Sequence, residues 1–182
     1  MKKKIVLLGD SIRIAYGQYV PELLGDDYDV WQPADNCRFA QYTLRMLFDE
    51  KHNLDGAHVI HWNNGLWDVP ELFDDGVFTP EDMYVNTMLR IAKILKNYTP
   101  NVIFATTTPV HPEYPYNDNK KIERMNALLV PKLKEMGIVI NDLHALAMAD
   151  LDGYLCEDKI HPSETGAKNC AMQAVQLIKQ FD

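Results

Sequence analysis

The sequence predicts a three-layer α/β/α domain built on a five-stranded parallel sheet. Short apolar runs alternate with amphipathic segments along the chain, and the apolar runs are continuous instead of alternating with polar residues. Strands of this kind are buried on both faces, as in a parallel sheet covered by helices. Right-handed crossovers then place helices on both sides of the sheet. We therefore expect a single domain spanning residues 1–182.

The apolar and amphipathic segments give the expected order of elements. The expected strands span residues 4–8, 28–32, 57–62, 101–107 and 137–141, and the expected helices span residues 12–24, 38–51, 80–98, 119–136 and 163–180. Pro80, which two acidic residues follow, favours a helix start, and Gly137 favours a helix end. Pro131 lies inside a helical pattern and predicts a kink or break there.

The composition argues against several classes of partner. The formal net charge is −8, and no stripe of Lys and Arg suits a phosphate backbone, so we expect no nucleic-acid partner. No apolar segment has the length of a membrane span, and the run after the N-terminal lysines is too short for a secretory signal. Cys37, Cys156 and Cys170 lack metal-ligand spacing, which favours reduced thiols. We expect a cytoplasmic protein with no metal, no cofactor and no membrane contact.

The first expected strand ends in Gly9, Asp10 and Ser11. In sheets of this class ligands bind beyond the carboxyl ends of the strands, so these residues are candidates for chemistry. Ser11 has two interpretations. It is either the N-cap of the following helix or a nucleophile on a tight strand-to-helix turn.

Asp158 and His161 lie three residues apart, in the loop before the last expected helix. A histidine at this position can accept the serine proton near neutral pH and later return it to a leaving group. A carboxylate beside it fixes the imidazole tautomer and stabilises the imidazolium. Together with Ser11, these residues predict a Ser-His-Asp site at one edge of the sheet.

The same residues resemble the SGNH hydrolases, the GDSL-type esterases and lipases. "GDS" at 9–11 matches their first block, and "DKIH" at 158–161 matches their closing Asp-x-x-His block. The resemblance implies a flavodoxin-like α/β/α sandwich that hydrolyses esters without a cofactor. It also implies Ser11 as nucleophile, His161 as base and Asp158 as the residue that orients His161.

The third block of that family, usually Gly-x-Asn-Asp, corresponds to "HWNN" at 61–64. The resemblance therefore gives Asn63 the role of oxyanion donor. An amide donor at a strand end also suits this role on physical grounds, because it can meet the negative oxygen of a tetrahedral intermediate. The alternative is a turn residue, since Asn-Asn-Gly is favourable turn chemistry.

The second block usually supplies a glycine whose backbone N–H completes the oxyanion hole, but "ADNCRFA" at 34–40 contains no glycine. We expect the N–H of Cys37 to take its place, with Asn36 and Arg38 as alternatives. The N–H of Ser11 is the remaining donor that the resemblance implies.

Three residues near these blocks are candidates for substrate binding: Arg38, Asn64 and Trp67. Arg38 can hold a substrate carboxylate or hydroxyl groups, or it can pair with Asp35. Trp67 suits stacking on a sugar face or packing in the core. The loop 108–118, which is rich in proline and contains two tyrosines, is either a wall of the pocket or a rigid surface connection.

The leading hypothesis is a serine esterase that removes an acetyl or other short acyl group from a carbohydrate or small metabolite through an acyl-enzyme. The absence of an obvious apolar lid in the sequence favours short acyl groups over long-chain lipids. The alternative is a non-catalytic ligand-binding module on the same fold, which the unusual middle blocks favour. A nucleotide or flavin binder is disfavoured because the first turn has neither a Gly-x-Gly-x-x-Gly nor a P-loop pattern.

Overall fold

The computed structural model describes residues 1–73 and 75–182, and within them five strands form one sheet in the order β2-β1-β3-β4-β5. The strands are β1 (Lys3–Leu8), β2 (Tyr28–Trp31), β3 (Val59–Asn63), β4 (Val102–Ala105) and β5 (Val139–Asn141). Every neighbouring pair is parallel. The predicted parallel sheet is therefore confirmed.

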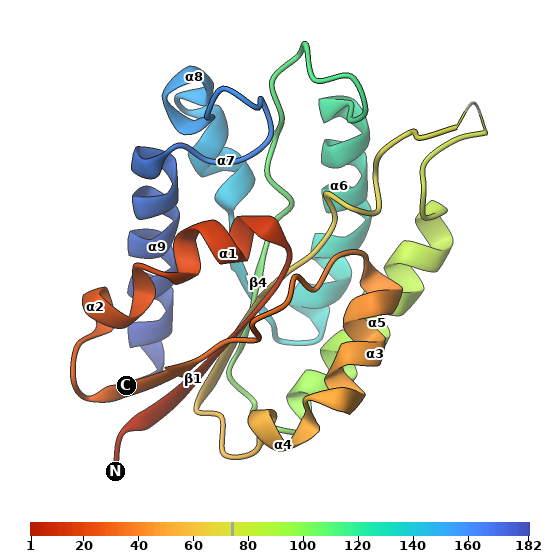
Figure 1. Ribbon diagram of the computed structural model, residues 1–182. Helices are drawn as coiled ribbons and strands as arrows, with labels where there is room; N and C mark the ends of the chain where they lie inside the picture. The colour runs from red at the N-terminus through yellow and green to blue at the C-terminus, as the bar shows by residue number, and fades with distance from the viewer. Residues whose placement is uncertain (74) are drawn as a thin grey trace.

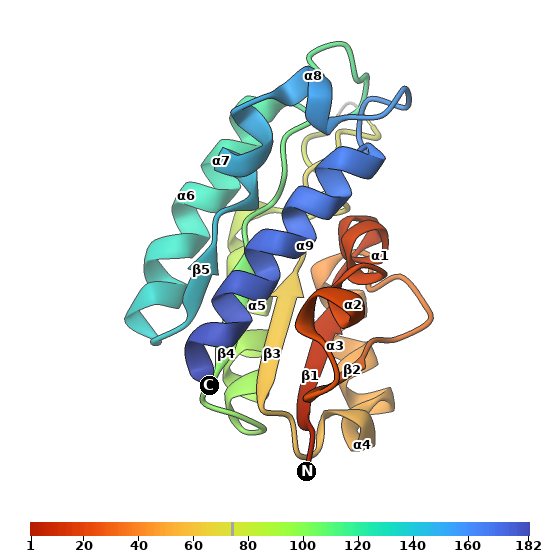
Figure 2. The ribbon, with the colours of Figure 1, turned by 90° about the vertical axis from the view of Figure 1, so that its left-hand side faces the viewer.

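Helices cover both faces of the sheet (Figures 1 and 2). They are α1 (Ser11–Gly17), α2 (Val20–Leu24), α3 (Ala40–Asp49), α4 (Lys51–Leu54), α5 (Glu81–Lys96), α6 (Asn119–Glu135), α7 (Leu143–Met148), α8 (Leu151–Tyr154) and α9 (Glu164–Ile178). The helices α1, α2 and α9 lie on one face, and α3, α5 and α6 lie on the other. The predicted three-layer sandwich is confirmed. Among the described residues, no helix is both long enough and apolar enough to cross a lipid bilayer.

The central strands are buried because helices pack on both of their sides. All residues of β3 and β4 are buried, and so are residues 5–8 of β1. The edge strands β2 and β5 are only partly buried. This burial pattern explains why the central strands are continuous apolar runs in the sequence.

Three helical features differ from the predictions. The pattern at 12–24 forms two helices, and the short helices α7 and α8 were not predicted. The helix α6 runs through Pro131 without a break, so the prediction of a break there is wrong. Pro131 is exposed, while Leu129 and Leu133 on either side of it are buried. We attribute the continuity of α6 to this packing, which offsets the hydrogen bond that proline removes.

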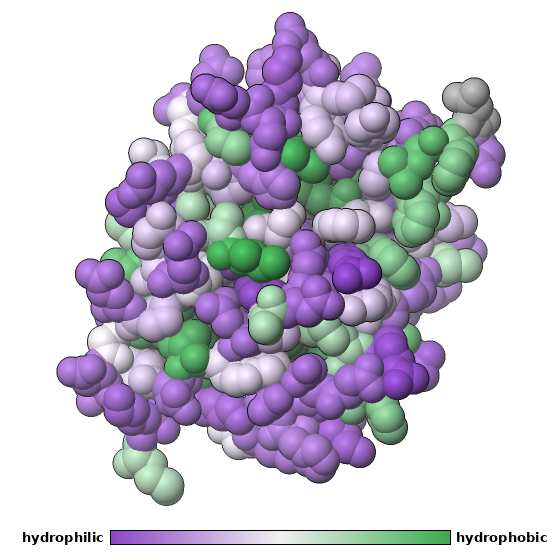
Figure 3. Space-filling view, viewed as in Figure 1, coloured by the Kyte–Doolittle hydropathy of each residue, from purple (hydrophilic) through white to green (hydrophobic). Residues whose placement is uncertain are grey.

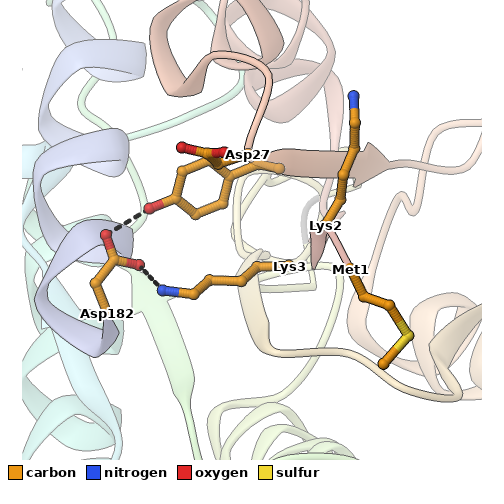
Figure 4. Close-up of a pocket in the computed structure, with 6 residues that line it drawn as sticks. Met1, Lys2, Lys3, Asp27 and Asp182 are labelled. Atoms are coloured by element: carbon orange, nitrogen blue, oxygen red, sulfur yellow. Dashed lines mark hydrogen bonds and ion pairs between the residues drawn. The ribbon is translucent and has the colours of Figure 1, made fainter.

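The C-terminus closes against the amino ends of β1 and β2. The carboxylate of Asp182 accepts hydrogen bonds from the Lys3 ammonium, at 2.8 Å, and from the Tyr28 hydroxyl (Figure 4). These side chains line a polar hollow together with Met1 and Lys2. The hollow lies at the end of β1 opposite to Ser11, so it is separate from the candidate site.

Gly9, at the carboxyl end of β1, has no room for a side chain. Its φ angle is 154°, and a Cβ atom there would lie 2.0 Å from Asn63 Oδ1 and 2.8 Å from Arg13 Cβ. Asn63 ends β3, the strand next to β1. The glycine therefore allows the ends of the two strands to approach directly before Ser11.

We expect Gly9→Ala to lower the free energy of unfolding by about 2–5 kcal/mol, because it adds overpacking to an unfavourable backbone conformation. Gly56→Ala is the matched control, since Gly56 has a φ angle of 74° but nothing within 4 Å of a Cβ atom. The control should lose only the backbone contribution, about 1–2 kcal/mol. Urea denaturation measures both variants, and equal losses would contradict the steric explanation.

Candidate active site

Ser11 is the first residue of α1, and two residues separate it from the end of β1. Asp10 Oδ1 accepts the N–H of Ile12 at 3.0 Å, so Asp10 caps the helix, and the interpretation of Ser11 as its N-cap is wrong. The Ser11 hydroxyl instead contacts His161, the residue predicted to be its partner. Its Oγ lies 2.8 Å from His161 Nε2. The turn therefore presents the hydroxyl at the edge of the sheet.

His161 and Asp158 belong to the loop between α8 and α9. Asp158 Oδ2 lies 2.6 Å from His161 Nδ1. Asp158 Oδ1 accepts the backbone N–H groups of Ile160, at 3.0 Å, and His161, at 2.9 Å. The loop ends where Ser163 caps α9 by accepting the N–H of Gly166. The structure thus brings Ser11, His161 and Asp158 together in one chain of hydrogen bonds.

The hydrogen bonds to Asp158 fix its charge and the tautomer of His161. Burial acts to raise the pKa of Asp158, but the hydrogen bonds from His161 and the Cys156 thiol hold it well below the usual range of Asp. An ionised carboxylate only accepts hydrogen bonds, so the proton of the neutral imidazole is on Nδ1. The lone pair of Nε2 then faces the Ser11 hydroxyl. This is the arrangement that a general base requires.

Asn63 lies at the carboxyl end of β3, beside the turn that carries Ser11. Its Nδ2 donates to Asp10 Oδ1 at 2.8 Å, and its side chain is buried. A carboxamide nitrogen carries two N–H groups, and this contact uses one of them. The structure therefore places an amide donor next to Gly9 and Asp10, the two residues before Ser11.

Cys37 is not able to act as predicted. Its backbone N–H donates to the carbonyl of Gly9 at 3.1 Å, and its Sγ accepts the Gly9 N–H at 3.1 Å. The prediction that Cys37 supplies an oxyanion donor is wrong, because this N–H already has a partner. The N–H of Arg38, one alternative, donates to Asn36 Oδ1 at 2.7 Å. Asn36, the other alternative, lines the cleft beside Ser11, but its N–H donates to Asp35 Oδ1 at 2.8 Å.

Asn64 is a structural residue, and its prediction as a substrate-binding residue is wrong. It is fully buried, and its Nδ2 lies 2.8 Å from both the Arg38 carbonyl and Thr43 Oγ1. Its Oδ1 accepts the indole N–H of Trp62 at 2.8 Å. Asn64, directly after β3, therefore points toward α3, while the side chain of Asn63 lies against Asp10 and Gly9.

The other two predicted substrate residues have different outcomes. The guanidinium of Arg38 lies 3.6 Å from Asp35 and 4.6 Å from the centre of the Tyr42 ring. It does not line the cleft, and it forms the alternative, a pair with Asp35, so its role in substrate binding stays a prediction. Trp67 does line the cleft.

An open cleft of about 530 Å³ begins at Ser11 and His161. One wall comes from residues that follow β3, and the other comes from the loop 108–118 and Ile160. The residues after β3 that line the cleft are Leu66, Trp67, Pro70, Leu72 and Phe78. Figure 3 shows apolar side chains gathered at the upper right of the view, where Figure 1 draws the segment after β3. The loop 108–118 is thus a wall of the pocket. Apart from Trp67, the apolar wall after β3 was not predicted.

Solved structures match this architecture over nearly the full chain, although neither a protein-family model nor a curated protein sequence matches it. An acetylxylan esterase from Geobacillus stearothermophilus matches with a TM-score of 0.77 at 17% identity, covering 97% of this chain and 94% of that one. A lipase/acylhydrolase from Enterococcus faecalis matches with a TM-score of 0.74 at 16% identity, covering 98% and 96%. A GDSL-like lipase from Bacteroides thetaiotaomicron gives 0.72 at 19% identity, covering 98% and 88%.

The chain has the SGNH/GDSL hydrolase fold. The fold that the "GDS" and "DKIH" blocks predicted is therefore confirmed. In this chain the two blocks lie at the carboxyl edge of the sheet, where the first block follows β1 and the closing block precedes α9.

Arg13 was not among the predicted site residues, although it holds two blocks of the SGNH fold together. Arg13 belongs to α1, and its side chain is buried. It donates to the carbonyls of Gly9 at 3.3 Å, Asp35 at 2.7 Å and Pro33 at 3.0 Å. The sequence holds a signal for this structural role, because Arg13 is a positively charged residue on the apolar face of α1, next to buried Ile12.

Asp68 is a second buried charge that was not predicted. It follows Trp67, and both of its carboxylate oxygens lie 3.1 Å from the Ala40 backbone nitrogen, at the start of α3. Burial raises the pKa of Asp68 to about 7, although hydrogen bonds from Ala40 and Thr79 act to lower it. This carboxyl group links the segment after β3 to the block that contains Cys37.

The raised pKa of Asp68 predicts a pH dependence of stability. The unfolded chain releases this proton near the ordinary Asp value, about 4. The folded protein keeps it up to about pH 7, so between these values the folded state binds more protons and stability falls as the pH rises.

We expect Asp68→Asn to lack this contribution. The unfolding free energy of the wild type minus that of the variant should therefore decrease between about pH 4 and pH 8. Urea unfolding across this range measures the difference, and a difference that does not change with pH would contradict the assignment.

Proposed function

We propose that this chain is a carboxylic ester hydrolase in which Ser11 is the nucleophile, His161 the general base and Asp158 its orienting partner. The observation that carries the proposal is the continuous hydrogen-bond chain, 2.8 Å from Ser11 Oγ to His161 Nε2 and 2.6 Å from His161 Nδ1 to Asp158 Oδ2. The SGNH/GDSL fold supports it, since proteins named as lipases and acetylxylan esterases share this fold.

The proposed reaction has two halves. Ser11 Oγ attacks the ester carbonyl while His161 Nε2 takes the hydroxyl proton, and Asp158 stabilises the resulting imidazolium. The imidazolium then protonates the leaving alcohol, and the acyl group remains on Ser11. A water molecule, deprotonated by His161, hydrolyses this acyl-enzyme and restores the free hydroxyl.

Two groups are proposed to stabilise the oxyanion that forms in each half. They are the Ser11 N–H and the second amide N–H of Asn63. Asn63 is supported by its position against Gly9. Preorganised donors of this kind stabilise the transition state more than the substrate.

The proposed substrates are short-chain acyl esters, such as acetyl esters, of a carbohydrate or other small metabolite. Two of the proteins that share the fold are named acetylxylan esterases, which supports a short acyl group. We propose that Trp67 contacts the substrate, since it lines the cleft beside the serine.

We expect Ser11→Ala to reduce the hydrolysis of p-nitrophenyl acetate by at least about 1000-fold without changing the unfolding transition, because the variant removes only the nucleophile. A fluorophosphonate probe should label the wild type at Ser11 and leave the variant unlabelled. A non-catalytic binding module on the same fold predicts a wild type that stays unlabelled and has no turnover. Undiminished turnover by Ser11→Ala would exclude the serine mechanism.

Two adjacent asparagines should respond in opposite ways. Asn63→Ala should lower kcat about 100- to 1000-fold with a smaller effect on KM, because the lost donor acts in the transition state. Asn64→Ala, the matched control, should mainly lower stability, because it leaves the buried partners of its side chain unpaired. Steady-state kinetics and thermal unfolding of both variants test this contrast, and a larger kcat loss in Asn64→Ala would contradict it.

A further inference from the structure

Three residues that follow β3 present large apolar side chains to the cleft that begins at Ser11. Trp67, Leu72 and Phe78 all line it and remain 43%, 48% and 45% exposed. Burying large apolar groups is favourable, so a cluster of them left exposed beside a reactive serine is a feature of a binding surface. The wall is part of the cleft and not an isolated patch on the surface.

Ring contacts hold the walls in place. Phe39 and Phe78 pack edge to face with ring centres 5.5 Å apart, and Tyr114 and Tyr116 pack with ring centres 5.9 Å apart. All four rings line the cleft. Aromatic pairs of this geometry gain energy beyond the burial of their area, so the apolar walls are formed before a ligand arrives.

The cleft offers little to a polar ligand. Among the described residues that line it, none is Asp, Glu, Lys or Arg. Besides the Ser11–His161 pair, the tyrosine hydroxyls and the indole N–H of Trp67, its polar side chains are those of Asn36 and Asn117. Asn117 Nδ2 donates to the Leu66 carbonyl at 3.3 Å, and Asn36 Oδ1 accepts the Arg38 N–H at 2.7 Å. Each amide therefore has one of its two polar atoms engaged with the backbone.

We propose that this cleft binds an uncharged aryl or alkyl group of the ester, and that Trp67, Leu72 and Phe78 determine this preference. The inference rests on the proposed ester hydrolysis. Within that proposal it selects esters of an apolar metabolite over those of a carbohydrate, because most hydroxyl groups of a sugar would lose water and face apolar side chains here. The aryl or alkyl group belongs either to the alcohol or to the acyl portion of the ester.

Two series of esters separate these sources. In the first, the acyl group is always acetyl, and the alcohol is either 1-naphthylmethanol or methyl glucoside, both of which leave as aliphatic alcohols. In the second, the alcohol is always p-nitrophenol, and the acyl chain is lengthened from acetyl to hexanoyl. We expect kcat/KM to rise by at least about tenfold toward the apolar member of one series, and that series identifies the portion that the cleft holds. No rise in either series would overturn the proposal.

Neighbouring residues of the wall give a matched pair of variants. Leu72→Ser should lower kcat/KM for the preferred apolar ester by about tenfold and leave the acetate of methyl glucoside unaffected. Phe73→Ser is the control, since Phe73 is 71% exposed and does not line the cleft. The control should retain the wild-type preference. Equal losses in both variants, or a loss of the same size on both substrates, would overturn the assignment of the wall.

A binding measurement separates failure of this inference from failure of the proposed function. Isothermal titration of the Ser11→Ala protein with 1-naphthol and with methyl glucoside needs no catalysis. We expect 1-naphthol to bind at least about tenfold more tightly. Tight binding of 1-naphthol without turnover by the wild type would reject the esterase and keep the apolar site. Turnover with preferred binding of methyl glucoside would keep the esterase and overturn the apolar site.

Discussion

The lack of a side chain at Gly9 is the constraint on which the candidate site depends. Parallel pairing sets Leu8 of β1 opposite Trp62 of β3, so the next residues, Gly9 and Asn63, meet where the two strands end. The Asn63 side chain fills the space in which a Cβ atom of Gly9 would lie. The same glycine exchanges hydrogen bonds with Cys37 and accepts one from Arg13. Gly9, two residues before Ser11, thus brings together the segments that contain Cys37 and Asn63.

Buried polar groups surround Gly9. Because their burial costs free energy, the site needs a large apolar core beneath it. Burial raises the pKa of Asp10, although hydrogen bonds from Ile12 and Asn63 and the charge of Arg13 act to lower it. Each buried carboxyl group costs free energy that its partners recover only in part. The central strands and their helices supply the compensating apolar burial, since β1 and β3 are the strands that also carry the site. The apolar burial that stabilises the fold therefore lies next to the buried polar groups that destabilise it.

The sequence predicted the sheet because the central strands are continuous apolar runs. It singled out Ser11, Asp158 and His161 because all three lie in recognisable blocks. It did not predict α7 and α8, which are too short to show helical periodicity. The errors at Cys37 and Asn64 have one cause. A motif gives the position of a residue along the chain, but the direction of its N–H or side chain depends on neighbours that only the folded chain brings together.

The walls of the cleft were the least predictable part of the site, and the reason is physical. Trp67, Leu72 and Phe78 show neither strand nor helix periodicity, so nothing in the local pattern distinguishes them from scattered surface residues. The two walls of the cleft face each other because the segment after β3 and the loop after β4 leave adjacent strands on the same edge of the sheet. The start of α1 positions Ser11, and the loop before α9 positions Asp158 and His161, while the other two segments fix what lies beside them. Under the proposed function, substitutions in those two segments can therefore change the substrate without altering the hydrogen-bond chain from Ser11 to Asp158.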